Sequence, residues 1–452
     1  MKRVLIANRG EIALRAIRAC RQLGLESVGV YSIADANSPH AWAADRAICV
    51  GPPPSKESYL RGERLLEVAR QTGCDAVYPG YGFLSEDSKF AEACDAAGLI
   101  FVGPTAETIA AMGDKVRARQ AAASFGIPVV PGSEEGFLRN EEAEACAERI
   151  GFPLLLKASA GGGGRGMRVA SHAEEFSTVF KQASAEADAT FGNAEVYLER
   201  FFPEVRHIEI QVFGDKSGGA VHLWERDCSV QRRHQKLVEE SPSPALNASV
   251  RREMTEAALA LTVGLKYENA GTVEFIYDPE TERFFFIEMN TRIQVEHPVT
   301  EMLHGKDLVA EQFKVAQGEL LSFSTPPEPE GSSAIEFRIN AEDSAHEFRP
   351  MPGVLAKWRP PSGPEIRVDT HVYETYRIPP FYDSMLAKLI VRGRSRAQAI
   401  ERAQWALAQF EVAGVPTTIP FHCKLLKAPA FTQGRMHTRW VEKEFVTPEI
   451  AA

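Results

Sequence analysis

Polar side chains recur at every second position over residues 284–300. One parity holds Glu288, Asn290, Arg292, Gln294 and Glu296, and the other holds Ile287, Met289, Ile293 and Val295. In an extended backbone this pattern would give one apolar face and one face of carboxylates, amides and a guanidinium. An ordinary half-buried strand with solvated polar residues shows the same alternation, so both interpretations stay open.

The aromatic run at 284–286 indicates that this strand enters from a core. A buried carboxylate such as Glu288 is then costly unless another group compensates its charge. Glu and Asn oxygens are hard ligands that suit Mg²⁺, whose other ligands are normally waters and substrate phosphates. A second strand-like segment, 271–276, carries Glu274. Glu274 and Glu288 on neighbouring strands would form a two-carboxylate metal pair.

A glycine-rich segment lies between two strand-like runs, one ending at Lys157 and the other at 168–170. The segment contains Gly161, Gly162, Gly163 and Gly164. This strand, loop and strand differ from a P-loop, which needs Gly-Lys-Ser/Thr leading into a helix. Backbone N–H groups of such glycines can approach phosphates closely, or the glycines can let a lid hinge. A mobile solvent loop is the alternative interpretation.

Positive charge is concentrated over residues 226–236 of an otherwise acidic chain. Such a run usually forms a solvated face, and lone histidines such as His207 and His234 are more often structural than functional. The run lies between the alternating segment 207–212 and the carboxylate strand 271–276. That position favours a local anion site.

The first hundred residues alternate short β-rich runs with helical patterns. We expect strands at 4–7, 27–31, 47–50, 76–78 and 100–102, and helices at 11–23, 59–72 and 88–97. This alternation predicts a parallel, doubly wound sheet. Residues 80–86 follow a strand end, where ligands of such sheets tend to bind, although a tight turn explains them equally well. Further along, Ser171 and Glu174 indicate a helix capping box.

Composition limits the class of protein. The 452 residues are too many for one core and indicate about three domains. A net charge of −10 argues against a general nucleic-acid or anionic-membrane surface, and no apolar run has membrane-spanning length. Seven cysteines without a Cys-x-x-Cys pair favour reduced thiols. With a strand beginning within four residues of Met1, we expect a cytoplasmic protein.

These segments together resemble the biotin carboxylase subunits of multisubunit biotin-dependent carboxylases, within the ATP-grasp superfamily. The resemblance runs from Met1 to about Phe445. It is carried by residues 6–13, 79–86, 112–115, the glycine-rich segment and 288–298. The last string is highly specific to biotin carboxylation, whereas any one of the glycine motifs alone would be weak.

The resemblance implies an α/β architecture with an ATP-grasp fold. Residues 1–112 would form an N-terminal doubly wound parallel-sheet domain, and 113–202 a small mobile lid with the glycine-rich loop. Residues 203–330 would form the ATP-grasp catalytic core, and 331–446 a C-terminal α+β domain.

The resemblance also implies the site residues. ATP would be bound by Lys115, Lys157, Gly161, Gly162, Gly163, Gly164, Glu199, Arg200, Phe201, Phe202, His207, Gln231, His234, Glu274, Ile276 and Glu288. Mg²⁺ or Mn²⁺ would be held by Glu274, Glu288 and Asn290. Bicarbonate would lie on Lys236, Arg292, Gln294 and the Val295 N–H. Glu296 would be the general base, and Arg338 and Tyr81 would bind biotin. The catalytic set would be Glu296, Arg292, Arg338 and Lys236.

The implied reaction is ATP- and bicarbonate-dependent carboxylation of biotin through carboxyphosphate. Since the chain has no Ala-Met-Lys-Met biotinylation motif, we expect biotin on a separate biotin carboxyl carrier protein. The other expected partners are a carboxyltransferase subunit and a second copy in a homodimer, with Trp358, Tyr373 and Tyr376 as contact or core residues. We expect no nucleic acid and no membrane. An acetyl-CoA carboxylase is the expected type, but the acceptor stays open among acetyl-CoA, propionyl-CoA, pyruvate and others.

Two other classes stay open. Another ATP-grasp ligase would share the lid and the metal pair, but it has no need for Arg338 together with residues 292–296. A non-catalytic nucleotide-binding subunit would tolerate loss of Glu296, which is present. Ala160, Phe201-Phe202 and residues 347–353 depart from the usual family sequence. Without the resemblance, Arg338 could also be a surface arginine paired with Glu336 or Glu342.

Overall fold

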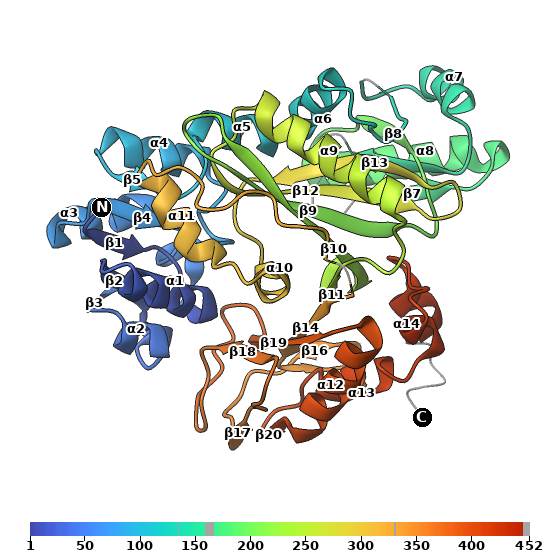
Figure 1. Cartoon of the computed structure of the whole chain (residues 1–452). Helices are drawn as coiled ribbons and strands as arrows, with labels where there is room; N and C mark the ends of the chain where they lie inside the picture. The colour runs from blue at the N-terminus through green and yellow to red at the C-terminus, as the bar shows by residue number, and fades with distance from the viewer. Residues whose placement is uncertain (134, 159–166, 330, 446–452) are drawn as a thin grey trace.

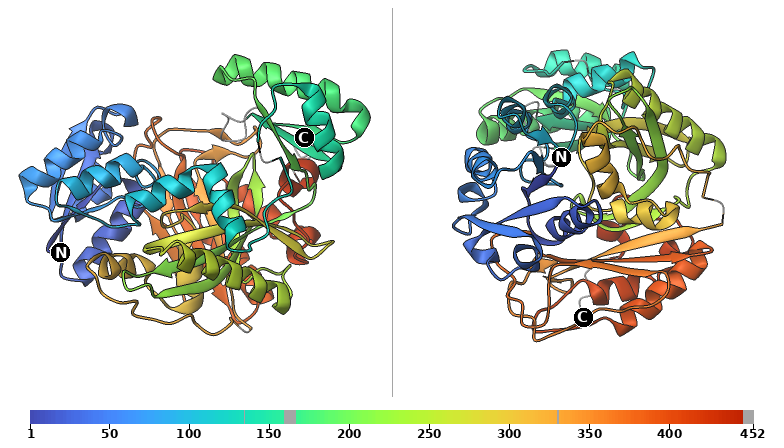
Figure 2. Two further views of the ribbon diagram at one scale, coloured as in Figure 1. Left: turned by 90° about the horizontal axis from the view of Figure 1, so that it is seen from above. Right: turned by 60° about the vertical axis from the view of Figure 1, so that its left-hand side comes forward.

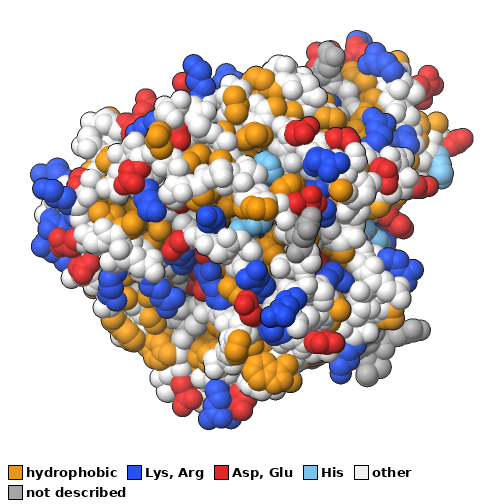
Figure 3. Space-filling model, viewed as in Figure 1, with side chains coloured by type: hydrophobic (Ala, Val, Ile, Leu, Met, Phe, Trp, Pro, Cys, Tyr) orange, Lys and Arg blue, Asp and Glu red, His pale blue; other side chains and the backbone are white. Residues whose placement is uncertain are grey.

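The computed structural model describes residues 1–133, 135–158, 167–329 and 331–445. Within these ranges no helix is long and apolar enough to cross a membrane. Figure 1 shows the N-terminal region beside a long central sheet, with the C-terminal region below it. On the face drawn in Figure 3, Lys and Arg side chains are interspersed with Asp and Glu.

The N-terminal region is a five-stranded parallel sheet in the order β3-β2-β1-β4-β5. Its strands are β1 (Arg3–Ile6), β2 (Glu26–Ser32), β3 (Arg46–Gly51), β4 (Ala76–Tyr78) and β5 (Ile100–Phe101). Its helices are α1 (Gly10–Gln22), α2 (Pro39–Ala43), α3 (Gly62–Thr72), α4 (Ser88–Ala96) and α5 (Ala106–Gly113). The predicted parallel sheet is confirmed. Helix α3 begins three residues later than predicted, because Tyr59 is fully buried and donates a hydrogen bond to Asp35.

A small three-stranded sheet follows helix α6 (Lys115–Ser124). Its antiparallel order is β7-β6-β8, with β6 (Leu154–Ala158), β7 (Met167–Ala170) and β8 (Val196–Arg200), and it carries α7 (Asn140–Ile150) and α8 (Ala173–Phe191). The predicted strands on either side of the glycine-rich segment are confirmed. Gly161, Gly162, Gly163 and Gly164 lie outside the described residues.

The predicted capping box is wrong by one residue. Helix α8 begins at Ala173, so its third residue is Glu175 rather than Glu174. The Glu175 carboxylate accepts hydrogen bonds from the backbone N–H groups of Ser171 and His172. The helix start is therefore satisfied by a carboxylate, as a capping box requires, but at a different position.

The central and C-terminal regions share one antiparallel eight-stranded sheet in the order β13-β12-β9-β10-β11-β14-β19-β18. Its bounds are β9 (Arg206–Gly214), β10 (Ala220–Arg232), β11 (Gln235–Ser241), β12 (Asn269–Asp278), β13 (Arg283–Asn290), β14 (Ser333–Asn340), β18 (Ile366–Thr370) and β19 (Met385–Gly393). Helices α9 (Ala248–Gly264), α10 (His297–His304) and α11 (Leu308–Ala316) accompany the central strands. The β11–β14 pairing crosses the proposed boundary at residue 330.

The rest of the C-terminal region comprises β15 (Glu342–Asp343), β16 (Arg349–Pro350), β17 (Lys357–Arg359), β20 (Glu411–Ala413), α12 (Arg396–Gln409), α13 (Ile419–Leu425), α14 (Pro429–Thr432) and a last helical turn, Val441–Phe445. Of these elements, α12 packs onto β14 and β19, and α13 packs against α12. Tyr376 is a core residue, Trp358 packs edge-on against Phe410, and Tyr373 packs against Trp42. In Figure 2 the N-terminal region and the lid lie at opposite ends of the molecule.

The prediction of one continuous strand over residues 284–300 is wrong beyond Asn290. Strand β13 ends there, residues 291–296 form turns, and α10 starts at His297. The alternation also fails at Ile287, which is 39% exposed rather than packed. A register shift beside Glu274 leaves Ile287 without a cross-strand partner, and such a bulge rotates the side chains next to it.

Candidate active site

A cleft of about 1250 Å³ lies between the lid, the central sheet and the two terminal regions. Its lining brings together most of the predicted residues: Tyr81, Lys157, Glu199, Arg200, Phe201, Phe202, His207, Gln231, His234, Lys236, Glu274, Ile276, Glu288, Asn290, Arg292, Gln294, Val295, Glu296 and Arg338. Lys115 is exposed and does not line the cleft. Its positive charge nevertheless opposes the overall rise in the pKa of Glu288. The predicted glycines are outside the described residues.

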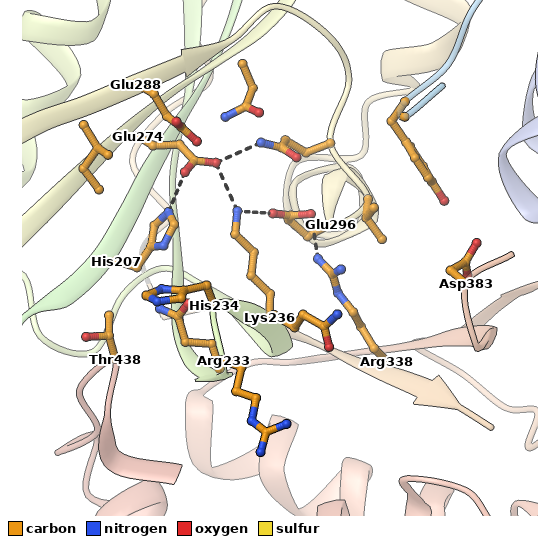
Figure 4. Close-up of a pocket in the computed structure, with 18 of the residues that line it drawn as sticks. His207, Arg233, His234, Lys236, Glu274, Glu288, Glu296, Arg338, Asp383 and Thr438 are labelled. Atoms are coloured by element: carbon orange, nitrogen blue, oxygen red, sulfur yellow. Dashed lines mark hydrogen bonds and ion pairs between the residues drawn. The ribbon is translucent and has the colours of Figure 1, made fainter. Parts of the chain in front are cut away.

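Glu274 and Glu288 face each other as direct register partners on β12 and β13, and Figure 4 shows them side by side. Burial raises the pKa of Glu288, and the charge of Glu274 adds to the rise. Burial would also raise the pKa of Glu274, but Lys236 and His207 hold it well below its usual range. His207 Nε2 lies 2.8 Å from Glu274 Oε2.

These donors fit a hard divalent cation. Two facing carboxylates on adjacent strands offer the hard oxygen ligands that Mg²⁺ prefers. The third predicted ligand, Asn290, presently accepts a hydrogen bond through Oδ1 from Arg292 Nη2 at 2.9 Å.

Lys236 on β11 joins three carboxylates. Its Nζ lies 2.5 Å from Glu209 Oε2, 2.7 Å from Glu296 Oε1 and 3.2 Å from Glu274 Oε1. Burial alone would lower the pKa of Lys236, but the surrounding anionic groups raise it well above its usual range. Glu209 was missed by the sequence analysis, although it shares the parity of His207 on β9.

Glu296 ends the turn before α10 and is 1% exposed. Its Oε2 accepts a hydrogen bond from Arg338 Nη2 at 3.0 Å, while its Oε1 pairs with Lys236. Burial would raise the pKa of Glu296, but Lys236, Arg338 and Arg226 hold it well below its usual range. Glu296 is therefore held as an ionised carboxylate.

Arg338 on β14 is a half-buried arginine, and both surface pairings considered for it are wrong. It pairs with Glu239 on β11 and with Glu296, rather than with Glu336 or Glu342. Glu239 was also missed by the sequence analysis. It stands beside Glu240 in the sequence, so a pattern of alternating polar residues gave no signal for it.

The Arg292 guanidinium donates hydrogen bonds to four oxygens, including Asn290 Oδ1 and the carbonyl of Ile293. Its Nε donates to Glu86 Oε2 at 2.7 Å, and its Nη1 donates to Gln294 Oε1 at 2.6 Å. Gln294 in turn donates through Nε2 to Glu274 Oε1 at 3.0 Å. Glu86 belongs to the turn at 80–86. That turn therefore contacts the site through a carboxylate and is more than a tight turn in the fold.

Another chain of contacts fixes Tyr81. Its hydroxyl donates to Glu11, and Glu11 Oε1 lies 3.0 Å from Lys388 Nζ. Lys388 is fully buried and also donates to the carbonyl of Val295 at 2.9 Å. Tyr81 is therefore connected to the backbone beside Glu296 by two buried charged groups.

The end of the cleft toward the lid is aromatic. Phe202 stacks on Phe285 with ring centroids 5.0 Å apart, and the Arg439 guanidinium lies 5.6 Å from the Phe201 ring centroid. Lys157 pairs with Glu199 across β6 and β8. Such surfaces can hold a planar base next to charged groups. The contribution of Thr438 and Arg439 from the C-terminal segment was not predicted.

The β10–β11 turn presents His234 to the cleft. Both residues of this two-residue turn have positive φ, 49° at Arg233 and 63° at His234. A type I′ hairpin turn needs positive φ at both positions, which is uncommon for residues other than glycine. Figure 4 shows His234 beside Lys236 and facing Thr438.

Three family models match successive parts of the chain. They are "Biotin carboxylase, N-terminal domain" at residues 1–109, "Carbamoyl-phosphate synthase L chain, ATP binding domain" at 114–324, and "Biotin carboxylase C-terminal domain" at 336–443. The chain belongs to the biotin carboxylase family. It is a biotin carboxylase of the ATP-grasp type, a ligase, and the predicted family and fold are confirmed.

Full-length relatives agree with this assignment. "Biotin carboxylase 1" of Bacillus subtilis (strain 168) is 51% identical over 443 residues, covering 98% of each chain. "Biotin carboxylase, chloroplastic" of Arabidopsis thaliana is 48% identical over 450 residues, covering 99% of this chain and 84% of the relative.

Solved structures of the family have the same fold. A Campylobacter jejuni biotin carboxylase in a "beta-gamma-ATP" complex superposes with a TM-score of 0.91 at 41% identity, covering 98% of this chain and 99% of the other. The biotin carboxylase domain dimer of the Hydrogenobacter thermophilus 2-oxoglutarate carboxylase, in complex with MgADP, ADP and bicarbonate, also gives 0.91, at 43% identity, covering 100% and 98%.

Proposed function

We propose that this biotin carboxylase carries out the first half-reaction of a biotin-dependent carboxylase within this one cleft. ATP and bicarbonate give carboxyphosphate, and biotin on a separate carrier protein is then carboxylated. The observation that carries the proposal is the position of Glu296. Its two oxygens pair with Lys236, next to the carboxylate pair, and with Arg338, so it joins the two ends of the cleft.

In this proposal ATP binds at the aromatic end of the cleft. Lys115, Lys157 and the backbone of Gly161, Gly162, Gly163 and Gly164 contact its phosphates, and the lid closes over it. Glu274, Glu288 and Asn290 hold Mg²⁺ or Mn²⁺. When bound, the ion neutralises charge on the phosphates during phosphoryl transfer, a reaction that depends on positioning and electrostatics.

Bicarbonate binds on Lys236, Arg292, Gln294 and the Val295 N–H. The planar guanidinium of Arg292 suits a planar oxyanion because it can donate two parallel hydrogen bonds. Glu86, Asn290 and Gln294 fix the orientation of that guanidinium. The Glu296 carboxylate accepts the bicarbonate proton as the bicarbonate oxygen attacks the γ-phosphoryl group, the bond to the bridging oxygen breaks, and ADP leaves.

Biotin binds at Arg338 and Tyr81. Carboxyphosphate breaks down to CO2 and phosphate, and the phosphate removes the proton from biotin N1′. The guanidinium of Arg338 stabilises the negative charge that develops on the ureido oxygen. N1′ then attacks CO2 to give carboxybiotin.

The same proposal includes a biotin carboxyl carrier protein, a carboxyltransferase subunit, a homodimer and a cytoplasmic location. A dimer has been described for the 2-oxoglutarate carboxylase relative. Proteins similar to this chain include one named only as a biotin carboxylase and one that belongs to a 2-oxoglutarate carboxylase. In this proposal the carboxyltransferase partner selects the acceptor molecule. Identifying the carrier protein that copurifies would reduce the number of candidate acceptors.

Steady-state ATP hydrolysis tests the proposed function. We expect slow hydrolysis that requires both bicarbonate and Mg²⁺ and that accelerates when free biotin is added. A rate that is indifferent to bicarbonate would favour another ATP-grasp ligase.

A further inference from the structure

Glu239 is a fully buried carboxylate directly behind Arg338. It lies on β11, and its register partner on β14 is Glu336, two residues before Arg338. Its Oε1 accepts a hydrogen bond from Arg338 Nε at 2.6 Å and also lies 2.6 Å from Nη2. With no solvent to compete, such a charge-assisted pair fixes the guanidinium firmly.

The remaining donors of Arg338 point elsewhere. Nη2 also donates to Glu296 Oε2 at 3.0 Å. Within the described part of the chain no hydrogen bond is found from Nη1, and Arg338 lines the cleft. Glu239 therefore holds the inner edge of the guanidinium and leaves its outer end available to a ligand. Figure 4 shows the guanidinium turned toward Glu296.

Two carboxylates thus compete for one guanidinium. Without the charge of Glu239, Glu296 would be the remaining carboxylate in contact with Arg338, and the guanidinium would shift toward it. That shift would displace the group from biotin. An arginine side chain also has many rotamers, so an anchoring partner reduces the freedom that must be lost on binding.

We propose that Glu239 is a positioning residue for the biotin half-reaction, because it aims the guanidinium of Arg338 at the ureido oxygen and keeps it from moving further onto Glu296 than the single contact from Nη2. The inference depends on the proposed role of Arg338. Partners behind a functional group typically contribute about 10- to 100-fold to its performance. We expect an effect of that size on carboxybiotin formation alone.

The variant Glu239→Gln keeps the shape of the side chain and removes its charge. We expect kcat for carboxylation of free biotin to fall about 10- to 100-fold, while bicarbonate-dependent ATP hydrolysis without biotin and the KM for ATP change less than about threefold. Glu239→Asp keeps the charge and should restore part of the lost rate.

Glu240→Gln is the matched control. Glu240 is the next residue on β11, so its side chain points to the opposite face of the sheet, where it binds Arg396 through Nε at 2.5 Å and Nη2 at 3.1 Å. Glu240 is buried to a similar extent as Glu239, and the Glu240→Gln variant removes the same kind of ion pair. We expect wild-type rates for both half-reactions.

The pH dependence of the carboxylation rate distinguishes this positioning role from a purely structural one, which would not change it. Glu239 faces Arg338 and Glu336 from β14, Lys236 from β11 and Glu296 from the turn before α10. Burial, with a contribution from Glu296, raises the pKa of Glu239 to about 7 against the opposing effects of Arg338 and Lys236. As the pH falls through that value the wild-type carboxylate is lost. The ratio of wild-type to Glu239→Gln carboxylation rates should therefore shrink from pH 8 to pH 6.

A double-mutant comparison completes the test. In an Arg338→Gln background, Glu239→Gln should cause no further loss of carboxylation, because the group it positions is already gone. Unchanged carboxylation in Glu239→Gln, or equal loss of both half-reactions with an intact circular dichroism spectrum, would overturn the inference. If Arg338→Gln itself fails to separate the half-reactions, the proposed role of Arg338 fails instead.

Discussion

At the residue scale, the charge balance of the cleft depends on Lys236. Three carboxylates from β9, β12 and the turn before α10 lie within 3.2 Å of its ammonium group. Two of them, Glu274 and Glu296, have a depressed pKa to which Lys236 contributes. Removing the cation would take away a positive charge that three buried carboxylates share, and would leave them only Arg226, His207 and Arg338 as partners.

We therefore expect Lys236→Met to destabilise the fold by about 3 kcal/mol or more, the usual cost of breaking a buried ion pair from one side. Bicarbonate-dependent ATP hydrolysis should fall at least about 100-fold, because the variant loses both a bicarbonate ligand and the group that keeps Glu296 ionised. Chemical denaturation and the ATPase assay measure the two effects.

Lys216→Met is the control, since Lys216 is exposed in the β9–β10 turn. It should leave both quantities within experimental error of the wild type. A Lys236→Met protein as stable as this control would show that the three carboxylates do not need the cation.

Sequence reasoning found the residues of the site that lie in distinctive strings. Glu288, Arg292 and Glu296 belong to one such string, and the structure places all three on the cleft. Glu209 and Glu239 were missed because their importance comes from which strands are neighbours. Lys236 and Glu209 are in contact because β9 and β11 both flank β10. Neither segment alone contains a sequence signal for that strand order.

At the scale of the element, the β11–β14 pair places Glu239 opposite Glu336 with both side chains fully buried. Burial raises the pKa of Glu336 well above its usual range, and Glu239 adds to the rise while Lys388 opposes it. A carboxyl whose pKa is higher in the folded protein binds more protons there than in the unfolded chain. Its contribution to stability therefore falls as the pH rises above about 4.3, its unfolded value.

Glu336→Gln should remove this dependence. We expect the variant to unfold at a higher temperature than the wild type at pH 8, with a difference that shrinks toward pH 5. Thermal unfolding followed by circular dichroism at pH 5, 6.5 and 8 measures it, with the exposed Glu319→Gln as control. A difference that grows as the pH is lowered would contradict the assigned direction of the shift.

Elements were predicted well where one local pattern decides them. The five parallel strands and the strands around the glycine-rich segment followed from alternation and turn residues. The end of β13 was not predicted, because residues 291–296 keep the alternating parity while their side chains bind Glu86, Glu274 and Lys236 in turns. The bulge at Ile287 depends on how β12 and β13 pair, so the sequence of β13 alone does not predict it.

At the scale of the whole molecule, the lid core contains lid residues alone, whereas the larger C-terminal core also includes residues of the central region. A smaller cluster with Leu355 and Tyr376 lies within the C-terminal region. The lid cluster draws its residues from 137–198 alone, with Leu154, Leu156 and Phe176 among them. The C-terminal cluster combines Leu237 and Val238 of β11 with residues of β14, β19 and α12. The lid therefore packs as a unit of its own, whereas the central and C-terminal regions share one sheet, and β11 contributes to the C-terminal core.

Hydrogen exchange should show this division. Without nucleotide, amides of β6 and β8 should exchange faster than those of β11 and β14, and the lid amides should slow when ATP and Mg²⁺ are added. Lid strands that are as protected as β14 before nucleotide is added, or that do not respond to it, would contradict an independent lid. The sequence predicted a mobile lid, but it gave no sign that one sheet joins residues on both sides of position 330.

The central claim is that Glu296 serves both half-reactions and Arg338 only the second. The most direct test measures bicarbonate-dependent ATP hydrolysis without biotin, and carboxybiotin formation with it, in Arg338→Gln and Glu296→Ala. We expect Arg338→Gln to keep most of the first activity and to lose about 100- to 1,000-fold of the second, the usual effect of removing one donor from a developing charge, and Glu296→Ala to lose both. Equal loss of both activities in a folded Arg338→Gln protein would contradict the account.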